Sequence, residues 1–200
     1  MTTYELAIAA VWMASRAACA TPDNITVVVF DYVGVSHADL AEASREAGHV
    51  LHIAGVESAW SICEVNQKSH CDLPPAGTYL EVKILPPSME KALPEREALA
   101  YAAKCAAVER CTTAWVFYGP VAVFAQGRPV SVALACVMAH EIGHLMGLEH
   151  SEGGIMKARF RARDLRDASQ GRLRFEARQA LHLRDVAAIW MGTKLAGTGR

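Results

Sequence analysis

The stretch VMAHEIGHLMGLEHSEGGIM, residues 137–156, decides how this sequence is interpreted. It places His140 and His144 four positions apart. On an α-helix that spacing turns both imidazoles to one side, about one turn apart. Two neutral imidazoles so placed can bind one Zn²⁺ ion. The alternative is a helix whose histidines are simply solvated, and the two histidines alone leave that alternative open.

The residues that follow predict a complete catalytic zinc site. Such a site needs three protein ligands and one open position. Gly147 falls where the helix must end, and glycine tolerates the left-handed turn of a helix C-cap, so His150 can return to the same metal. Glu141 follows His140 directly, and its side chain is long enough to act as a general base on a metal-bound water. We therefore predict one catalytic Zn²⁺ ion, held by His140, His144 and His150.

This run of residues resembles a known family signature. HEIGHLMGLEH, residues 140–150, resembles the extended zinc motif of the metzincin metalloproteases, and GIM, residues 154–156, resembles their Met-turn. By that resemblance Met156 would form a hydrophobic floor beneath the zinc, whereas the alternative is a methionine that only fills the core. The order of elements is similar to that of matrixin-like catalytic domains and of short bacterial metzincin-like proteins.

The resemblance implies a zinc-dependent metalloendopeptidase that hydrolyses peptide bonds through a zinc-activated water, with Glu141 as general base. The substrate would be a peptide or protein, held extended along an edge strand at Leu99, Ala100, Tyr101 and Ala102. Two rivals remain: a non-proteolytic, zinc-containing peptide-binding module, and an amide hydrolase of a small non-protein substrate. The presence of Glu141 argues against the first rival, because a purely structural zinc needs no base.

Hydrophobic patterning predicts an α/β fold with a mostly parallel sheet, and the metzincin resemblance implies that this sheet is twisted and has an antiparallel edge strand. Propensity alone favours a helix over residues 95–110, but the resemblance places the edge strand at 99–102, and we favour the strand. The last helix should bury Ala180, Leu181, Val186 and Ile189. The other predicted strands are residues 25–30, 59–65, 79–85 and 114–118, and the predicted helices are residues 36–55, 130–146 and 175–191.

The bulk composition indicates one ordinary globular domain. The chain has 200 residues and a formal net charge of −1, which favours neither nucleic acid nor a membrane surface as a partner. No apolar run is long enough to span a bilayer. We expect a single, monomeric metzincin-like domain over residues 21–194 and a frayed tail over residues 195–200.

The N-terminus and the cysteines predict export. An apolar run at residues 6–14, followed by Ala18-Cys19-Ala20, resembles a signal peptide over residues 1–20, although no Lys or Arg precedes the run. The close spacing of Cys63 with Cys71 and of Cys105 with Cys111 suggests two local disulfides, and the matrixin resemblance implies that the second ties the edge strand to its neighbour. Disulfides persist in secreted or periplasmic proteins; the alternative is that all the cysteines are reduced thiols.

A few residues outside the zinc motif are further candidates for function. His49 and His52 lie three positions apart on the first predicted helix, but no third ligand is evident, so a solvated face is favoured. Residues 157–178 carry eight basic and three acidic residues, which suggests a solvated basic surface or a preference for acidic substrates. Phe160 is a candidate pocket residue, and Cys136 should pack in the core.

Overall fold

A computed structural model describes residues 24–65, 71, 73–75, 77–90, 98–103 and 112–197. The predicted signal peptide and the Cys105/Cys111 pair lie outside these residues. The elements, in chain order, are β1 (Ile25–Asp31), α1 (His37–Ile53), β2 (Ser58–Glu64), β3 (Leu80–Leu85), α2 (Pro87–Glu90), β4 (Ala100–Ala102), β5 (Thr113–Phe117), α3 (Tyr118–Ala125), α4 (Val130–Leu145), α5 (Ala162–Ser169) and α6 (Ala177–Gly197).

The strands form one sheet in the order β2-β1-β3-β5-β4. β1 pairs in parallel with β2 and β3, and β3 pairs in parallel with β5. β4 pairs antiparallel with β5 at the edge. The predicted α/β fold, with a mostly parallel sheet and an antiparallel edge strand, is therefore confirmed. The β-branched run ITVVVFD explains the central place of β1, because a strand covered on both sides must be apolar almost throughout.

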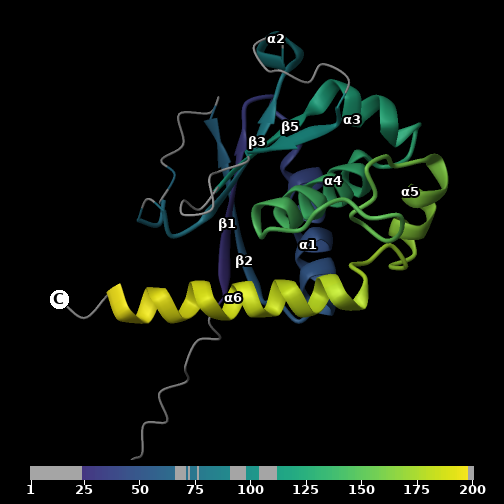
Figure 1. The fold of residues 1–200 in the computed structure, drawn as a ribbon. Coiled ribbons are helices and arrows are strands. Elements are labelled where there is room, and N and C mark those ends of the chain that lie inside the picture. The colour runs from purple at the N-terminus through teal and green to yellow at the C-terminus, as the bar shows by residue number, and fades with distance from the viewer. Residues whose placement is uncertain are drawn as a thin grey trace, which may run out of the picture.

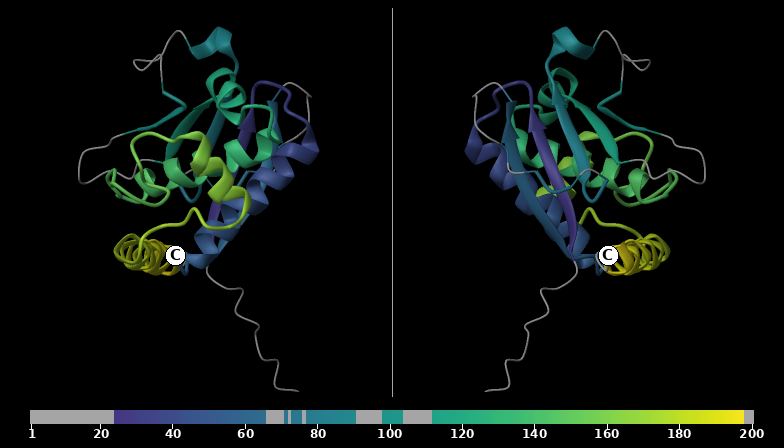
Figure 2. Two further views of the ribbon diagram at one scale, coloured as in Figure 1. Left: turned by 90° about the vertical axis from the view of Figure 1, so that its right-hand side faces the viewer. Right: turned by 90° about the vertical axis from the view of Figure 1, so that its left-hand side faces the viewer.

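Two helices, α1 and α4, pack against each other on one face of the sheet (Figures 1 and 2). α1 begins at Ser36, whose hydroxyl accepts a hydrogen bond from the Asp39 amide at 3.1 Å. Ser36 is therefore the N-cap of this helix. The inward face of α1 consists of four fully buried residues, Leu40, Ala43, Ala47 and Leu51. Because α4 packs against α1, the same core holds α4 in place.

The last helix, α6, crosses the end of the sheet at which β1 begins (Figure 1). Half of its predicted apolar face was wrong. Ala180 and Val186 pack against the core, but Leu181 is 53% exposed and Ile189 is 65% exposed, and Leu183 and Ala187 are buried instead. The helix also continues to Gly197, into the segment expected to be a tail. Neither α6 nor any other helix among the described residues has the length and apolar character needed to cross a membrane.

Four further segments differ from the prediction or were missed. The helix that propensity favoured over residues 95–110 is wrong where the chain is described there, because β4 occupies Ala100–Ala102. Helices α2, α3 and α5 were not predicted. In α5 only Asp164 and Leu165 are buried, and Leu165 is the one large apolar side chain by which the sequence could have marked this helix.

Candidate metal centre

Helix α4 supplies the first half of the centre. It begins after Pro129, whose fixed φ suits the start of a helix, and nearly all of its residues are buried. An apolar helix in the middle of the core holds its side chains in single positions. His140 and His144 lie near its C-terminal end, one turn apart, with His140 only 6% exposed.

The end of α4 supplies the turn that the sequence predicted. Gly147 has a φ of +88°. The Gly147 amide donates to the His144 carbonyl and the Leu148 amide donates to the Gly143 carbonyl, both at 2.9 Å. These two bonds form a Schellman motif, the usual way in which a helix stops at glycine. The chain reverses there and His150 returns to the helix.

The three histidines converge through their Nε2 atoms. His144 Nε2 lies 3.0 Å from His140 Nε2 and 3.1 Å from His150 Nε2, and the ligand atoms of all three lie within 4.8 Å of one another. A tetrahedral zinc ion about 2.1 Å from each nitrogen would hold the nitrogens about 3.4 Å apart. The residues present therefore fit a metal ion with only small adjustments.

The tautomers of the two helical histidines strengthen that fit. His140 Nδ1 donates to the Ile155 carbonyl and His144 Nδ1 donates to the Leu148 carbonyl, each at 2.7 Å. A carbonyl oxygen only accepts, so in the neutral ring Nδ1 carries the proton and Nε2 presents a lone pair. Two lone pairs 3.0 Å apart repel each other unless a cation lies between them. Such backbone partners are the usual outer support of a metal-bound histidine.

Burial keeps the innermost imidazole neutral. Desolvation, assisted by repulsion from His144 and His150, lowers the pKa of His140 to about 4, against the opposing effect of its hydrogen bond to Ile155. A ligand must be unprotonated to bind a metal. His140 is therefore ready to bind a cation throughout the neutral pH range.

Glu141 is the only acidic side chain of the motif that is buried. It is 5% exposed, and its Oε1 lies 4.0 Å from His140 Nε2. By contrast Glu149, next to the third histidine, is exposed. Glu141 thus places a carboxylate beside the point where the histidines converge, within reach of a molecule bound there.

Met156 packs against the helix turn that carries both histidines. It is fully buried, and a Cβ atom added to Gly143 would lie 2.6 Å from its sulfur. The thioether therefore occupies the space left by the missing side chain of Gly143. The Ser151 amide donates to the Met156 carbonyl at 2.8 Å. That bond closes the short path from His150 to Met156.

The edge strand β4 leaves one side open beside α4. The Phe117 amide donates to the Leu99 carbonyl and the Ala103 amide donates to the Thr113 carbonyl. Because bonding alternates along an antiparallel strand, the backbone groups of Leu99 and Tyr101 face β5, while those of Ala100 and Ala102 face away. No other described strand pairs with that side. Of the predicted substrate strand, Ala100 and Ala102 are the residues able to bind a further chain.

Comparison with known proteins agrees with this geometry. The sequence model of the matrixin peptidases matches residues 34–169. The chain belongs to the matrixin family. The crystal structure of archaemetzincin from Methanopyrus kandleri is similar in fold, with a TM-score of 0.53 and 14% identity, covering 83% of this chain and 97% of that one. A search of the curated proteins finds no match.

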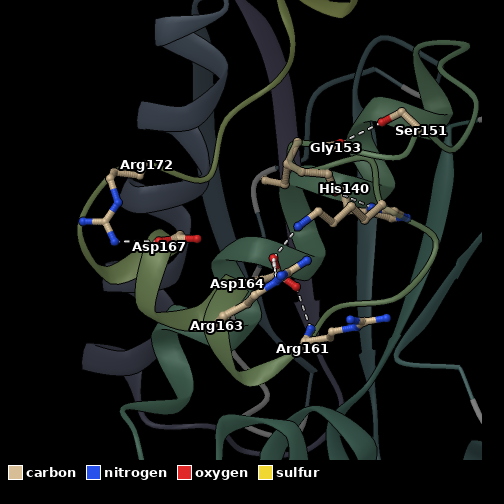
Figure 3. A network of polar contacts seen from close by, with 10 residues as sticks. His140, Ser151, Gly153, Arg161, Arg163, Asp164, Asp167 and Arg172 are labelled. Carbon is tan, nitrogen blue, oxygen red and sulfur yellow. Dashed lines mark hydrogen bonds and ion pairs between the residues drawn. The ribbon is translucent and has the colours of Figure 1, made fainter.

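The segment after the matrixin Met-turn is held by a buried acid that the sequence reasoning missed. Asp164, 1% exposed, accepts from Lys157 Nζ at 2.5 Å and from the Arg161 amide at 2.7 Å (Figure 3). Although burial opposes ionisation, these bonds and the positive charge of Lys157 keep the pKa of Asp164 below its ordinary value. An Asp three residues after a helix N-cap is the only local signal that could have marked it.

An aromatic pair borders the matrixin centre. The ring of Phe160 lies edge-on to His140 at 5.4 Å between centroids and stacks on Phe124 at 6.0 Å. The structure thus brings Phe160, a predicted pocket residue, to the metal centre. Phe124 was missed because it belongs to α3, which was not predicted.

In the described part of the chain, none of the remaining candidates joins the group of three histidines. Cys63 and Cys71 form a disulfide, with 5.6 Å between their Cα atoms, whereas the predicted Cys105–Cys111 pairing falls on residues that are not described. Cys136 is a buried free thiol, and burial together with the charge of Asp164 raises its pKa to about 12. His52 bonds to Glu57 at 2.6 Å, and among the described residues neither His49 nor His52 joins a metal-binding group.

Proposed function

We propose that this matrixin is a zinc-dependent endopeptidase with one catalytic ion. The observation that carries the proposal is the convergence of three Nε2 atoms beside the buried carboxylate of Glu141. A structural zinc site closes its coordination with four protein ligands, whereas a catalytic site has three and one open position. Among the described residues, the group that could hold a metal contains three histidines and no fourth ligand.

The residues of the chain have distinct tasks in this proposal. His140, His144 and His150 hold the ion, which when bound supplies a Lewis acid that polarises the substrate carbonyl and acidifies a water molecule. Glu141 takes the proton from that water and delivers it to the amide nitrogen that leaves. The outward backbone groups of Ala100 and Ala102 hold the substrate extended, as an added antiparallel strand.

The test is a matched pair of charge-removing substitutions, Glu141→Gln and Glu149→Gln. Both change a glutamate next to a histidine, but only Glu141 is buried beside the metal position. We expect Glu141→Gln to bind zinc and to lose at least a hundredfold of its cleavage rate on a fluorogenic peptide library, the usual size of a general-base contribution. Glu149→Gln should cleave as the wild type does.

The same assay separates the rivals. A wild-type protein that binds zinc but cleaves no peptide, with or without added chelator, contradicts the endopeptidase. It favours the zinc-containing peptide-binding module if peptides still bind, and the small-amide hydrolase if they do not. Chelator-sensitive cleavage that survives in Glu141→Gln contradicts the assigned general base while leaving the activity in place.

We also propose that the protein works outside the reducing cytoplasm, as a monomer. The Cys63–Cys71 disulfide supports the proposed location, because such bonds persist in oxidising compartments. Protein isolated from the exporting cell without reductant should begin at Thr21, and Cys63 and Cys71 should resist alkylation. A chain that retains residues 1–20 and alkylates at both cysteines would contradict export.

A further inference from the structure

The three zinc ligands are not supported equally. His140 and His144 each have Nδ1 bonded to a backbone carbonyl. His150 is exposed, and within the described part of the chain its Nδ1 has no such protein partner. The ring contacts the other two ligands, 4.6 Å from His144 and 5.3 Å from His140 between ring centroids, but no backbone carbonyl of the described residues fixes its orientation. Its position at the metal therefore depends on the backbone on either side of it.

That backbone is held by the next residue, Ser151. Its amide donates to the Met156 carbonyl and its hydroxyl donates to the Gly153 carbonyl, both at 2.8 Å. The second of these bonds is drawn in Figure 3. Ser151 thus closes the loop from both its main chain and its side chain. The Ser151 oxygen still has lone pairs that can accept, and one of them receives a bond from α6.

The donor is Gln179, near the start of α6. Its Nε2 lies 3.0 Å from Ser151 Oγ, and its Oε1 accepts from the Glu176 amide at 2.9 Å. The second bond is the returning half of a capping box, in which the third helical residue bonds the amide before the helix. Because only the amide oxygen can accept that bond, the Gln179 side chain has one orientation, with its nitrogen directed at Ser151.

We propose that Gln179 is a positioning residue for the third zinc ligand, acting through Ser151. This inference rests on the proposed zinc site and adds a residue that holds one of its ligands in position. Gln179 lies beyond residues 34–169, the part matched by the matrixin model. Two neighbouring contacts act in the same direction. His182 Nε2 donates to the Met146 carbonyl at 3.0 Å, and the Ile155 amide donates to the Arg174 carbonyl at 2.9 Å.

The experiment compares Gln179→Ala, Ser151→Ala and the double variant with Arg178→Ala, an exposed neighbour on the same helix. Three properties are measured: the Zn²⁺ dissociation constant by chelator competition, the visible spectrum of the Co²⁺-loaded protein, and urea unfolding of the metal-free protein. Loss of an outer support typically weakens metal binding by 10–100-fold. We expect about a tenfold loss in Gln179→Ala, with an altered Co²⁺ spectrum, and none in Arg178→Ala.

The double variant decides whether Gln179 acts through Ser151. If it does, the double variant binds Zn²⁺ no more weakly than Ser151→Ala alone, since coupled residues are not additive. Two independent losses that multiply would contradict the coupling. Unchanged affinity and spectrum in Gln179→Ala, or a change in urea unfolding alone, would overturn the positioning role. A wild-type protein that binds no Zn²⁺ would instead overturn the metal centre itself. The Ser151→Ala variant tests the loop while leaving the hydrogen bond between Gln179 and Glu176 at the start of α6 intact.

Discussion

The two halves of the metal centre are built in different ways. His140 and His144 lie on a buried helix, with backbone partners for their outer nitrogens. His150 is exposed, on a loop of residues 147–157 that we call the ligand loop. Segments far along the chain hold this loop at several points. A helix in the core can therefore position metal ligands by itself, whereas a loop needs contacts with distant parts of the chain to do so.

The largest effects should follow from removing one histidine from each half of the metal centre. His140→Ala and His150→Ala should both lose zinc binding by several orders of magnitude, because three ligands are required. Only His140→Ala should also destabilise the metal-free protein, by about 2 kcal/mol, since it leaves the Ile155 carbonyl buried without its partner. Urea unfolding with chelator present measures this. Equal destabilisation by both changes would contradict the comparison.

The far end of the ligand loop should depend on Asp164. Replacing Asp164 by Ala leaves Lys157, which is mostly buried, without its counter-charge, and breaking a buried ion pair costs about 3 kcal/mol. Replacing Asp167, which pairs with Arg172 at the surface, should cost less than about 1 kcal/mol. The free energy of unfolding of the two variants checks this, and a cost for Asp167→Ala that matched the cost for Asp164→Ala would contradict it.

Asp164 should also make the stability of the folded protein depend on pH. The pKa of Asp164 is lower in the folded chain than its ordinary value. Its contribution to stability is therefore present above the ordinary aspartate pKa of about 4 and is lost as the pH falls below it. Between pH 5 and pH 2 the wild type should lose stability more steeply than Asp164→Asn. Parallel stability curves for the two proteins over that range would exclude the contribution.

Local rules explain which parts were predictable from the sequence. The spacing of His140 and His144, the left-handed turn at Gly147 and the β-branched run of β1 each depend on neighbouring residues, so a pattern reveals them. Gln179 and Asp164 each lie three residues after a helix N-cap, but that local signal does not reveal their partners in the ligand loop, because tertiary packing sets those partners. Half of the predicted face of α6, Leu181 and Ile189, was wrong for the same reason. Leu181 and Ile189 are more apolar than Ala187, yet only Ala187 lies against the domain.

In the helix that carries His140 and His144, Gly143 should be needed because a larger residue has no room there. A Cβ there would lie 2.6 Å from the sulfur of Met156, whereas one at Gly192, also helical, would meet nothing within 4 Å. Gly143→Ala should therefore destabilise the protein by about 2 kcal/mol through overpacking. Gly192→Ala should be neutral or stabilising by up to about 1 kcal/mol, because alanine is the better helix former. Thermal unfolding of the two variants measures the effect of overpacking at position 143 and of helix propensity at position 192. Stabilisation by Gly143→Ala would show that Met156 can move aside.

At the junction of the two halves, Gly147 should matter for its backbone. Its φ of +88° and the φ of +65° at Gly171 both disfavour a side chain, so alanine at either position should cost about 1 kcal/mol. Only at Gly147 would the new methyl also approach another group, 3.2 Å from His182 Nε2, and only there does the turn carry a zinc ligand. We therefore expect equal backbone strain but a weaker Zn²⁺ affinity in Gly147→Ala alone, measured by chelator competition. Equal affinities in the two variants would mean that His150 finds the metal without the help of this turn, and the loop half would then be as independent of its surroundings as the helix.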